Sequence, residues 1–323
     1  MDYKHLGRSG LEVSRLCLGT MNFGPQTSED DSHAIMDRAH ELGINFFDTA
    51  NTYGWQKGKG LTEQIIGRWF AKGDGRRDRT VIATKLYGSM TDWPNDTFLS
   101  ARNIRRACDG SLRRLQTDHI DLYQMHHVDL NTPFDEIWEA MDVLRHQGKI
   151  IYVGSSNFAA WHIVKAQELA RRRHSTGLVS EQSIYNLAKR EVELEVLPAC
   201  ADLGVGVIPW SPLHGGMLAG VLRKEQEGKR RLAGRSAETL ERLRDSVEAY
   251  EKFCADLGEA PADVGIAWLL HQPVVTAPII GPRTMEQLEG AQRALEVDLG
   301  EDELARLDEI WPGHESAPRD YAW

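Results

Sequence analysis

The chain has 323 residues, of which 41% are hydrophobic and 27% charged, and its formal net charge is −10. This composition is typical of a globular protein, and the negative charge argues against nucleic acid or an anionic membrane as a partner. The four cysteines are widely spaced and form no CxxC pair, and the sequence has neither an apolar signal segment nor an apolar run of membrane-spanning length. We therefore expect a soluble cytoplasmic protein without a disulfide framework.

The first residues alternate apolar and polar side chains around Gly7-Arg8-Ser9-Gly10, which predicts a β-hairpin. Eight short apolar runs follow and predict strands at Arg15–Leu18, Asn45–Asp48, Val81–Lys85, Leu122–His126, Ile150–Ser155, Leu178–Gln182, Val205–Trp210 and Thr276–Ile280. Amphipathic segments between them predict helices at Glu29–Leu42, Leu61–Phe70, Thr97–Leu115, Pro133–Gln147, Ala159–Arg173, Val192–Leu203 and Met285–Ala294, with an extra helix at Glu301–Ile310. The interval from Trp210 to Thr276 has room for a large loop and one or two helices.

Eight alternations of strand and helix predict a closed (β/α)8 barrel of the TIM type rather than an open doubly wound sheet. An open dinucleotide-binding sheet would carry GxGxxG after its first strand, and the segment from Gly19 to Gly24 lacks that spacing. We expect one domain over residues 1–323, with the hairpin, the extra helices and a C-terminal tail near the barrel mouth. The basic runs Arg171–His174 and Lys229–Arg231 are interpreted as solvated surface.

Four polar residues follow closely on predicted strands. Asp48 closes INFFD, Tyr53 lies five residues further on, Lys85 closes VIATK and His126 closes IDLYQMH. The carboxyl ends of barrel strands form the active-site face, so we expect these side chains to meet there. A neighbouring lysine can lower the pKa of a phenol from about 10, which would suit Tyr53 as a general acid. Asp48 would keep a buried Lys85 cationic, and His126 could orient a carbonyl oxygen.

Each of these residues has another interpretation when it is taken alone. Asp48 could cap a turn or helix, and Tyr53 could be a loop aromatic. Lys85 could be the Schiff-base nucleophile of a lyase. His126 could bind a metal together with His127 and Asp129, but no second cluster has ligand spacing, so we predict no metal site. It is the set of four that indicates proton transfer to a carbonyl oxygen, with the hydride supplied by a cofactor.

Seven segments resemble those of the aldo-keto reductases: LGRSGLEVSRLCLGTMNFG, FFDTANTYG, VIATK, DLYQMHHVD, GKIIYVGSSNF, VIPWSPLHGGML and PIIGPRT. The resemblance covers nearly the whole chain and is strongest to the bacterial branch with sugar-nucleotide reductases and potassium-channel β-subunit relatives. It implies that Asp48, Tyr53, Lys85 and His126 form the catalytic tetrad, with Tyr53 as general acid. Because some relatives that reduce carbon–carbon double bonds carry Glu in place of this histidine, His126 favours carbonyl reduction.

The resemblance also implies NADPH, bound in an extended form across the barrel mouth. It assigns the nicotinamide to Ser156, Asn157, Gln182 and Trp210, the pyrophosphate to Ser211, Leu213, Gly215 and Gly216, and the adenosine end to Gly281, Arg283, Thr284 and Gln287. Further cofactor-binding positions are Gly19, Thr20, Met21, Asp48, Pro212 and Ile280. Glycine lets backbone N–H groups approach phosphate oxygens. Arg283 would meet the 2′-phosphate, so NADP is favoured over NAD.

Two segments depart from the family's pattern. Gly290 and Ala291 stand where an acidic residue and Asn are common, which weakens the expected adenine contacts. Residues 217–220 lack the Gly-Lys that often ends the phosphate loop, so we expect Arg223 or Lys224 to clamp the phosphates.

The expected substrate is a small aldehyde or ketone, such as a keto-sugar or a secondary-metabolite carbonyl, reduced to an alcohol. Its pocket is expected to be walled by Trp55, Trp93, His127, Tyr321 and Trp323. The alternatives are an NADPH-dependent enoyl reductase of a sugar nucleotide and a cofactor-sensing module like the channel β-subunits. The pattern does not predict the oligomeric state.

Overall fold

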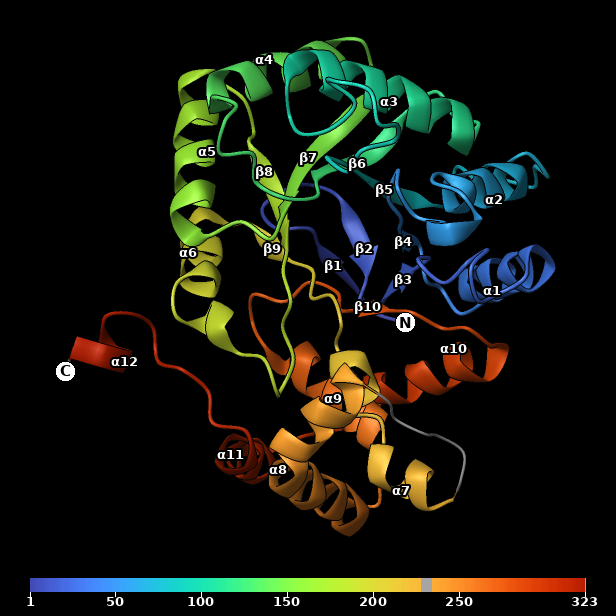
Figure 1. Ribbon diagram of the computed structural model, residues 1–323. Helices are drawn as coiled ribbons and strands as arrows, with labels where there is room; N and C mark the ends of the chain where they lie inside the picture. The colour runs from blue at the N-terminus through green and yellow to red at the C-terminus, as the bar shows by residue number, and fades with distance from the viewer. Residues whose placement is uncertain (228–233, 323) are drawn as a thin grey trace.

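The computed structural model describes residues 1–227 and 234–322 (Figure 1), so the basic run Lys229–Arg231 lies outside the described residues. Its main sheet has eight parallel strands in the order β10-β3-β4-β5-β6-β7-β8-β9. They are β3 (Cys17–Gly19), β4 (Phe46–Asp48), β5 (Val81–Leu86), β6 (Ile120–Met125), β7 (Ile150–Ser156), β8 (Leu178–Gln182), β9 (Gly206–Val207) and β10 (Ile279–Ile280).

The two edges of this sheet meet and close the barrel. Val207 donates its amide hydrogen to the Val274 carbonyl over 3.1 Å, and Thr276 donates to the Val207 carbonyl over 2.8 Å. At this closure β9 and β10 are each two residues long, shorter than the runs Val205–Trp210 and Thr276–Ile280 predicted, because single bonds replace a continuous ladder there. The prediction of a (β/α)8 barrel is confirmed.

The predicted hairpin is also confirmed, and it closes the amino-terminal end of the barrel. Strands β1 (Tyr3–His5) and β2 (Glu12–Ser14) pair antiparallel. Leu6 and Val13 are fully buried in the apolar cluster inside the barrel. At Gly7 the φ angle is +58°, and a Cβ atom would stand 2.5 Å from the Val179 carbonyl oxygen. Only glycine permits this close approach of the hairpin to the sheet.

Helices surround the barrel (Figure 1). They are α1 (Glu29–Glu41), α2 (Leu61–Phe70), α3 (Ala101–Leu115), α4 (Phe134–His146), α5 (Ala160–Arg172), α6 (Val196–Leu203), α7 (Val221–Gln226), α8 (Arg235–Leu257), α9 (Pro261–His271), α10 (Met285–Ala291), α11 (Glu301–Ile310) and α12 (Arg319–Ala322). Among the described helices, none is long and apolar enough to cross a membrane.

The helical predictions differ from the structure in several places. The helices predicted to start at Thr97 and Val192 begin at Ala101 and Val196, the first of them because Ser100 caps it. Three helices, α7, α8 and α9, lie between β9 and β10, where the sequence interval predicted one or two. The reason is a break between α8 and α9, where Gly258 has a φ of +77° and Pro261 starts the next helix. The last barrel helix, predicted over Met285–Ala294, ends at Ala291 and continues as a 3₁₀ turn.

The C-terminal tail lies against the loop that follows β8. Ala317 donates its amide hydrogen to the Leu194 carbonyl over 2.8 Å, and His314 donates to the Glu193 carboxylate over 2.9 Å. Since loops after barrel strands lie on the mouth side, the tail starts near the mouth as predicted. Figure 1 shows that α12 then projects away from the barrel.

Alternation along the strands divides the barrel interior into two layers. Phe46, Ala83 and Leu122 belong to the apolar cluster inside the barrel. Side chains of a strand return to the same face every second residue, so Asp48, Lys85 and Gln124 also point inward, one layer nearer the mouth. The intervening Phe47, Ile82 and Tyr123 face outward, in the cluster beneath the helices. The fold therefore places a polar layer directly above an apolar plug.

Candidate active site

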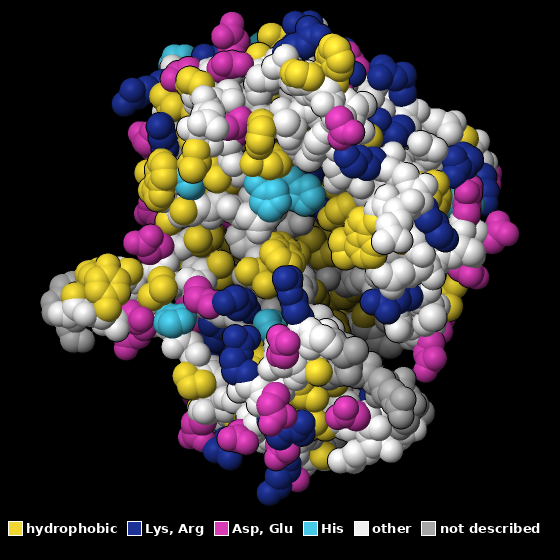
Figure 2. Space-filling model, viewed as in Figure 1, with side chains coloured by type: hydrophobic (Ala, Val, Ile, Leu, Met, Phe, Trp, Pro, Cys, Tyr) yellow, Lys and Arg dark blue, Asp and Glu magenta, His cyan; other side chains and the backbone are white. Residues whose placement is uncertain are grey.

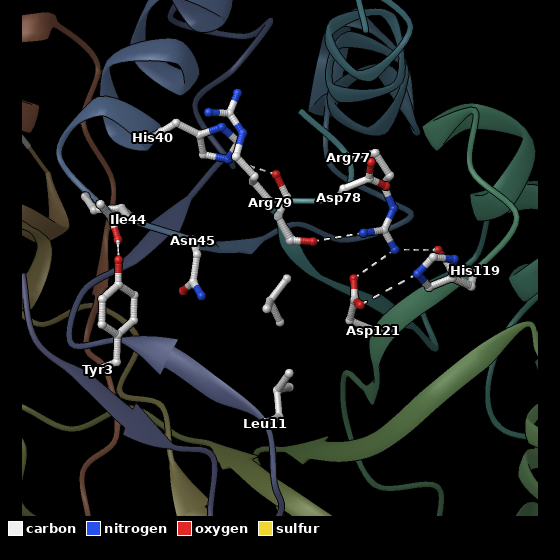
Figure 3. A pocket seen from close by; sticks show the side chains of 13 residues that line it. Tyr3, Leu11, His40, Ile44, Asn45, Arg77, Asp78, Arg79, His119 and Asp121 are labelled. Carbon is white, nitrogen blue, oxygen red and sulfur yellow. Dashed lines mark hydrogen bonds and ion pairs between the residues drawn. The ribbon is translucent and has the colours of Figure 1, made fainter. Parts of the chain in front are cut away.

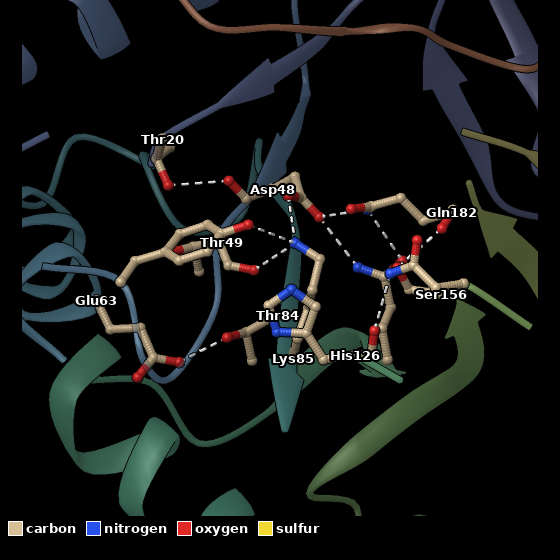
Figure 4. A network of polar contacts seen from close by, with 12 residues as sticks. Thr20, Asp48, Thr49, Glu63, Thr84, Lys85, His126, Ser156 and Gln182 are labelled. Carbon is tan, nitrogen blue, oxygen red and sulfur yellow. Dashed lines mark hydrogen bonds and ion pairs between the residues drawn. The ribbon is translucent and has the colours of Figure 1, made fainter. Parts of the chain in front are cut away.

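The polar layer brings three of the four tetrad side chains into contact (Figure 4). The Lys85 Nζ atom lies 2.5 Å from Asp48 Oδ2 and 3.4 Å from the Tyr53 hydroxyl oxygen, and it donates to the Thr49 carbonyl over 2.9 Å. Lys85 is fully buried, so this ammonium depends on protein oxygens in place of water. An ammonium thus stands between a carboxylate and a phenol.

The charges at this contact are set by burial and by the neighbouring groups. Burial lowers the pKa of Lys85, but Asp48 and Tyr53 raise it, and the resulting pKa lies above the ordinary value. Burial raises the pKa of Tyr53, and the opposing effect of Lys85 does not cancel this rise. Lys85 thus lowers the pKa of the phenol as expected, but burial outweighs it, so the pKa of Tyr53 lies above its ordinary value rather than below it. Tyr53 remains protonated at neutral pH, as a proton donor must.

His126 lies beside this contact as a neutral imidazole. Its ring is T-shaped to that of Tyr53, with centroids 6.1 Å apart, and stacked on that of His127, with centroids 5.1 Å apart. Burial lowers the pKa of His126 to about 3, and Lys85 and His127 contribute further. An uncharged imidazole keeps one N–H group, so His126 can orient an oxygen but does not carry a proton for transfer at neutral pH.

Two glutamines complete the surroundings of Asp48. Gln124 donates its side-chain amide to Asp48 Oδ1 over 3.0 Å, and Gln182 donates to the same oxygen over 2.9 Å. Gln182 is among the residues predicted at the cofactor, whereas Gln124 is not among the predicted site residues. The sequence does contain a signal that could have identified Gln124. It is a polar residue on a buried strand, two positions before His126, so its side chain points to the same face of the strand as that of His126.

The residues expected near the nicotinamide ring are joined in one network. Thr20 donates its hydroxyl to the Asp48 carbonyl over 2.9 Å, and Ser156 donates to the Gln182 carbonyl over 2.8 Å. The Trp210 indole donates to Asn157 Oδ1 over 3.1 Å. Gln182 keeps its side-chain oxygen for a further donor, because its amide nitrogen makes the bond to Asp48. Gly19 lies at the end of β3 beside Thr20, and Met21 is exposed.

The residues expected at the pyrophosphate form a tight loop after Trp210. Ser211, Gly215 and Gly216 have φ angles of +55°, +63° and +90°. The Ser211 hydroxyl accepts the Gly215 amide hydrogen over 3.2 Å, while Pro212 is buried and Leu213 half-buried. The Gly216 amide is likewise bonded within the loop, to the Leu213 carbonyl over 2.7 Å, so a diphosphate would have to replace these contacts to reach the two amides.

The residues expected at the adenosine end surround the start of α10. The Gly281 carbonyl, just after Ile280, accepts from Asn22 over 3.0 Å, and the Arg283 carbonyl accepts from Thr27 over 3.1 Å. Thr284 caps α10, while Gln287 accepts the Arg283 amide hydrogen over 2.8 Å. The side-chain carbonyl of Gln287 is therefore engaged at the start of the helix, and its side-chain NH₂ group is the part available to an adenine.

The two cations expected to clamp phosphate are both engaged elsewhere. Arg223 pairs with Glu227 at 3.6 Å, and Lys224 donates to the Ala219 carbonyl over 2.6 Å. Either side chain would have to exchange these contacts for a phosphate, so their assignment stays a prediction.

The candidate substrate residues that the structure describes do not form one group. His127 is the one that touches the tetrad, through its stacking on His126. Trp55 is 48% exposed, Trp93 74% and Tyr321 73%, the last on the projecting α12, while Trp323 lies outside the described residues. Two aromatic residues that were not predicted, Tyr87 and Phe98, form a row of rings with His127. The ring of Tyr87 is T-shaped to those of both His127 and Phe98. Figure 2 shows histidine side chains beside hydrophobic ones on this face.

A cavity of about 610 Å³ lies at the other end of the barrel, among residues that begin strands β4, β5 and β6 (Figure 3). Two charged residues of its wall, Arg77 and Asp121, pair with each other at 2.8 Å, and Arg79 donates to the Asp74 carbonyl over 3.0 Å. In barrel enzymes the amino-terminal end serves stability rather than catalysis. We therefore assign no function to this cavity. Among the described residues, no group of three His, Cys, Asp or Glu side chains is placed to hold a metal ion.

A closed parallel barrel with a buried cluster of Asp48, Lys85 and Tyr53 near its mouth is typical of a class of barrel enzymes, and comparison with known proteins identifies the family. The family model described as "Aldo/keto reductase family" matches residues 15–312, so the chain belongs to this family. It is 53% identical to "Uncharacterized oxidoreductase YrpG" of Bacillus subtilis over 100% of both chains. It is also 33% identical to versiconal hemiacetal acetate reductase of Aspergillus parasiticus, over 96% of each chain. A probable voltage-gated potassium channel subunit beta of Oryza sativa is 34% identical, over 92% of each chain. The chain is thus an oxidoreductase of the aldo/keto reductase family.

Proposed function

We propose that this protein reduces an aldehyde or ketone to an alcohol with NADPH as the hydride source, and that Tyr53 donates the proton. The observation that carries the proposal is the buried contact of Asp48, Lys85 and Tyr53, 2.5 and 3.4 Å apart at their polar atoms. A fully buried lysine that only stabilised the barrel would not need a phenol at the mouth as its third partner.

The proton transfer follows from the charges of this contact. Tyr53 is protonated at neutral pH, because burial raises its pKa, and can give its proton to a substrate oxygen. The ammonium of Lys85 stabilises the phenolate that remains, and Asp48 keeps that ammonium in place. The neutral imidazole of His126 can donate a hydrogen bond that orients the carbonyl. When NADPH is bound, its reduced nicotinamide supplies the hydride.

The residues around the mouth fit such a cofactor. The side-chain oxygen of Gln182 and the groups of Ser156 and Asn157 offer hydrogen-bond partners to a carboxamide. Gly215 and Gly216 lack side chains, so a diphosphate could approach the backbone of this loop closely. Arg283 favours the 2′-phosphate of NADPH, because guanidinium groups bind phosphate in a bidentate manner.

The proposed substrate is a secondary-metabolite carbonyl with apolar or aromatic character. Its supports are the row of His127, Tyr87 and Phe98 rings beside the tetrad and the similarity to versiconal hemiacetal acetate reductase. Aromatic rings pack against flat apolar groups more favourably than against sugar hydroxyls. We expect ketones and aldehydes with rings to be better substrates than open-chain keto-sugars.

The test is a panel of aldehydes, ketones, enones and keto-sugars, with oxidation of NADPH followed at 340 nm and NADH used in parallel. We expect carbonyl reduction, a lower KM for NADPH than for NADH, and no reduction of enone double bonds. Double-bond reduction without alcohol formation would replace the proposal with an enoyl reductase. Tight binding of NADPH with negligible turnover of every substrate would favour a cofactor-sensing role.

A further inference from the structure

The corner that joins β7 to α5 carries Ser156 and Asn157, the residues proposed to hold the nicotinamide carboxamide. Asn157 has a φ of +59°, in the left-handed region that is unfavourable for a residue with a side chain, although less so for Asn. Such backbone persists where surrounding contacts determine it. The contacts of this corner therefore decide how well the proposed cofactor site is formed before the cofactor arrives.

Glu181 makes several of these contacts from the neighbouring strand β8. Its side chain is fully buried, and Phe158 donates its amide hydrogen to Glu181 Oε1 over 3.1 Å. Ser155 donates its hydroxyl to Oε2, and Ser183 donates to Oε1 over 2.7 Å. One carboxylate thus binds the residue just before the pair Ser156–Asn157 and the residue just after it.

The charge of Glu181 has no cation beside it. Among residues 1–227 and 234–322, no Lys, Arg or His forms an ion pair with this carboxylate, and the titratable group that faces it is the Cys200 thiol of α6. Burial raises the pKa of Glu181 to about 7, against hydrogen bonds from Ser155, Ser183 and backbone amides, which lower it. An ionised carboxylate that is buried without a cation is unfavourable. The hydrogen bonds that it accepts from the corner are therefore the main interactions that stabilise its charge.

We propose that Glu181 is a positioning residue that holds residues 155–158, and through them Ser156 and Asn157, in the conformation that receives the nicotinamide carboxamide. The inference rests on the proposed function, because it takes Ser156 and Asn157 as the carboxamide site. Hydrogen bonds to an ionised acceptor are about twice as strong as neutral ones, so the ionised carboxylate holds the corner more firmly than the protonated one. The apparent affinity for the cofactor is proportional to the fraction of molecules in which the corner has this conformation. It therefore decreases when that fraction decreases.

Two substitutions separate the hydrogen bonds of Glu181 from its charge. Glu181→Met removes every acceptor and leaves the Phe158 amide without its partner. Glu181→Gln keeps a carbonyl oxygen for the Phe158 and Ser183 donors, and the Ser155 hydroxyl can turn to the Ser180 carbonyl, 3.4 Å away. We expect Glu181→Met to raise the Kd for NADPH about tenfold or more, and Glu181→Gln to raise it about two- to threefold at pH 8.

Gln167 of helix α5 provides a matched control, because its side chain binds the same strand β8. It is buried, and its side chain binds both backbone groups of Leu178 at the start of β8, far along the strand from the corner. Gln167→Leu therefore removes buried hydrogen bonds of β8 without touching residues 155–158. We expect it to lower the denaturation midpoint and to leave the Kd for NADPH within about twofold of the wild type.

The pH dependence of cofactor binding distinguishes positioning from packing. NADPH binding is measured by fluorescence titration from about pH 8 to about pH 6 for the wild type and Glu181→Gln. Since the folded carboxyl titrates near pH 7, the wild-type Kd should approach that of Glu181→Gln as the pH falls. The ratio of the two constants cancels the titration of the cofactor's own 2′-phosphate.

A ratio that stays constant with pH, or a folded Glu181→Met variant that binds NADPH like the wild type, overturns the role of Glu181 alone. If Glu181→Met does not fold, the ratio measured with Glu181→Gln still decides the matter. Failure of the wild type to bind NADPH would instead overturn the proposed function and, with it, the carboxamide site.

Discussion

The two layers inside the barrel differ in chemistry although they are two residues apart on the same strands. The lower layer contains Phe46, Ala83 and Leu122 and is closed from below by the hairpin residues Leu6 and Val13. The upper layer contains Asp48, Lys85 and Gln124, which are equally buried but bound to one another. Burial in the lower layer stabilises the fold through the hydrophobic effect, whereas burial in the upper layer shifts pKa values and fixes polar atoms. The lower layer therefore stabilises the fold, whereas the upper layer holds residues of the proposed catalytic site.

The largest expected effect comes from Tyr53→Phe, at the mouth side of the upper layer. It removes the proposed proton donor and keeps the ring, so kcat for carbonyl reduction should fall by about 10²–10⁴-fold. The Kd for NADPH, measured by fluorescence, should change little, because the hydroxyl's described bond is to Lys85. Residual kcat close to that of the wild type would contradict the role of Tyr53.

Phe46→Ala changes the lower layer beneath Asp48. Deleting a fully buried ring leaves a cavity, so the free energy of unfolding should fall by about 3–5 kcal/mol in urea denaturation. The activity of the molecules that stay folded should fall much less than in Tyr53→Phe. A loss of kcat as large as that of Tyr53→Phe, in a folded variant, would mean that the two layers are not separate in function.

Gln124→Leu changes the upper layer without removing a member of the tetrad. Asp48 Oδ1 keeps the bond from Gln182 and loses the one from Gln124, so Lys85 is held less firmly. We expect kcat to fall about tenfold, while the KM for NADPH stays within about twofold. Gln167→Leu, which changes another buried glutamine, serves as control and should leave kcat unchanged. Equal losses of kcat in both variants would falsify a specific role for Gln124.

The smallest expected effect is on the pH dependence of stability. The folded-state pKa of His126 is lowered to about 3, so between about pH 6.5 and pH 3 the unfolded chain binds a proton that the folded chain does not. Stability should therefore fall as the pH is lowered through this window, and His40, with a pKa of about 4, acts in the same direction. His126→Asn should show a shallower loss between pH 7 and pH 5. Parallel urea midpoints for the two proteins would argue against a neutral His126.

The sequence alone indicated the barrel, the hairpin and the strand ends at which Asp48, Lys85 and His126 lie. These features are local, because a strand's alternation and its final residue can be read along the chain. The long helical interval was less predictable, since Gly258 and Pro261 break it between α8, which has a polar face, and α9, in which residues 264–269 are all buried. Tyr53 was selected with the strand-end residues from its position after a strand end, whereas the family resemblance supplied the cofactor residues.

Only the tertiary structure decided which of these side chains hydrogen-bond to one another and what charge each of them carries. Gln124 and Gln182 meet on one oxygen of Asp48 although 76 and 134 positions separate them from it in sequence. The upward shift of the Tyr53 pKa and the neutral state of His126 follow from burial, which no local pattern states. The role of Glu181 likewise depends on a strand lying beside the corner that it binds. Periodicity fixes the face on which a side chain lies, whereas desolvation and partners depend on how the barrel closes around it.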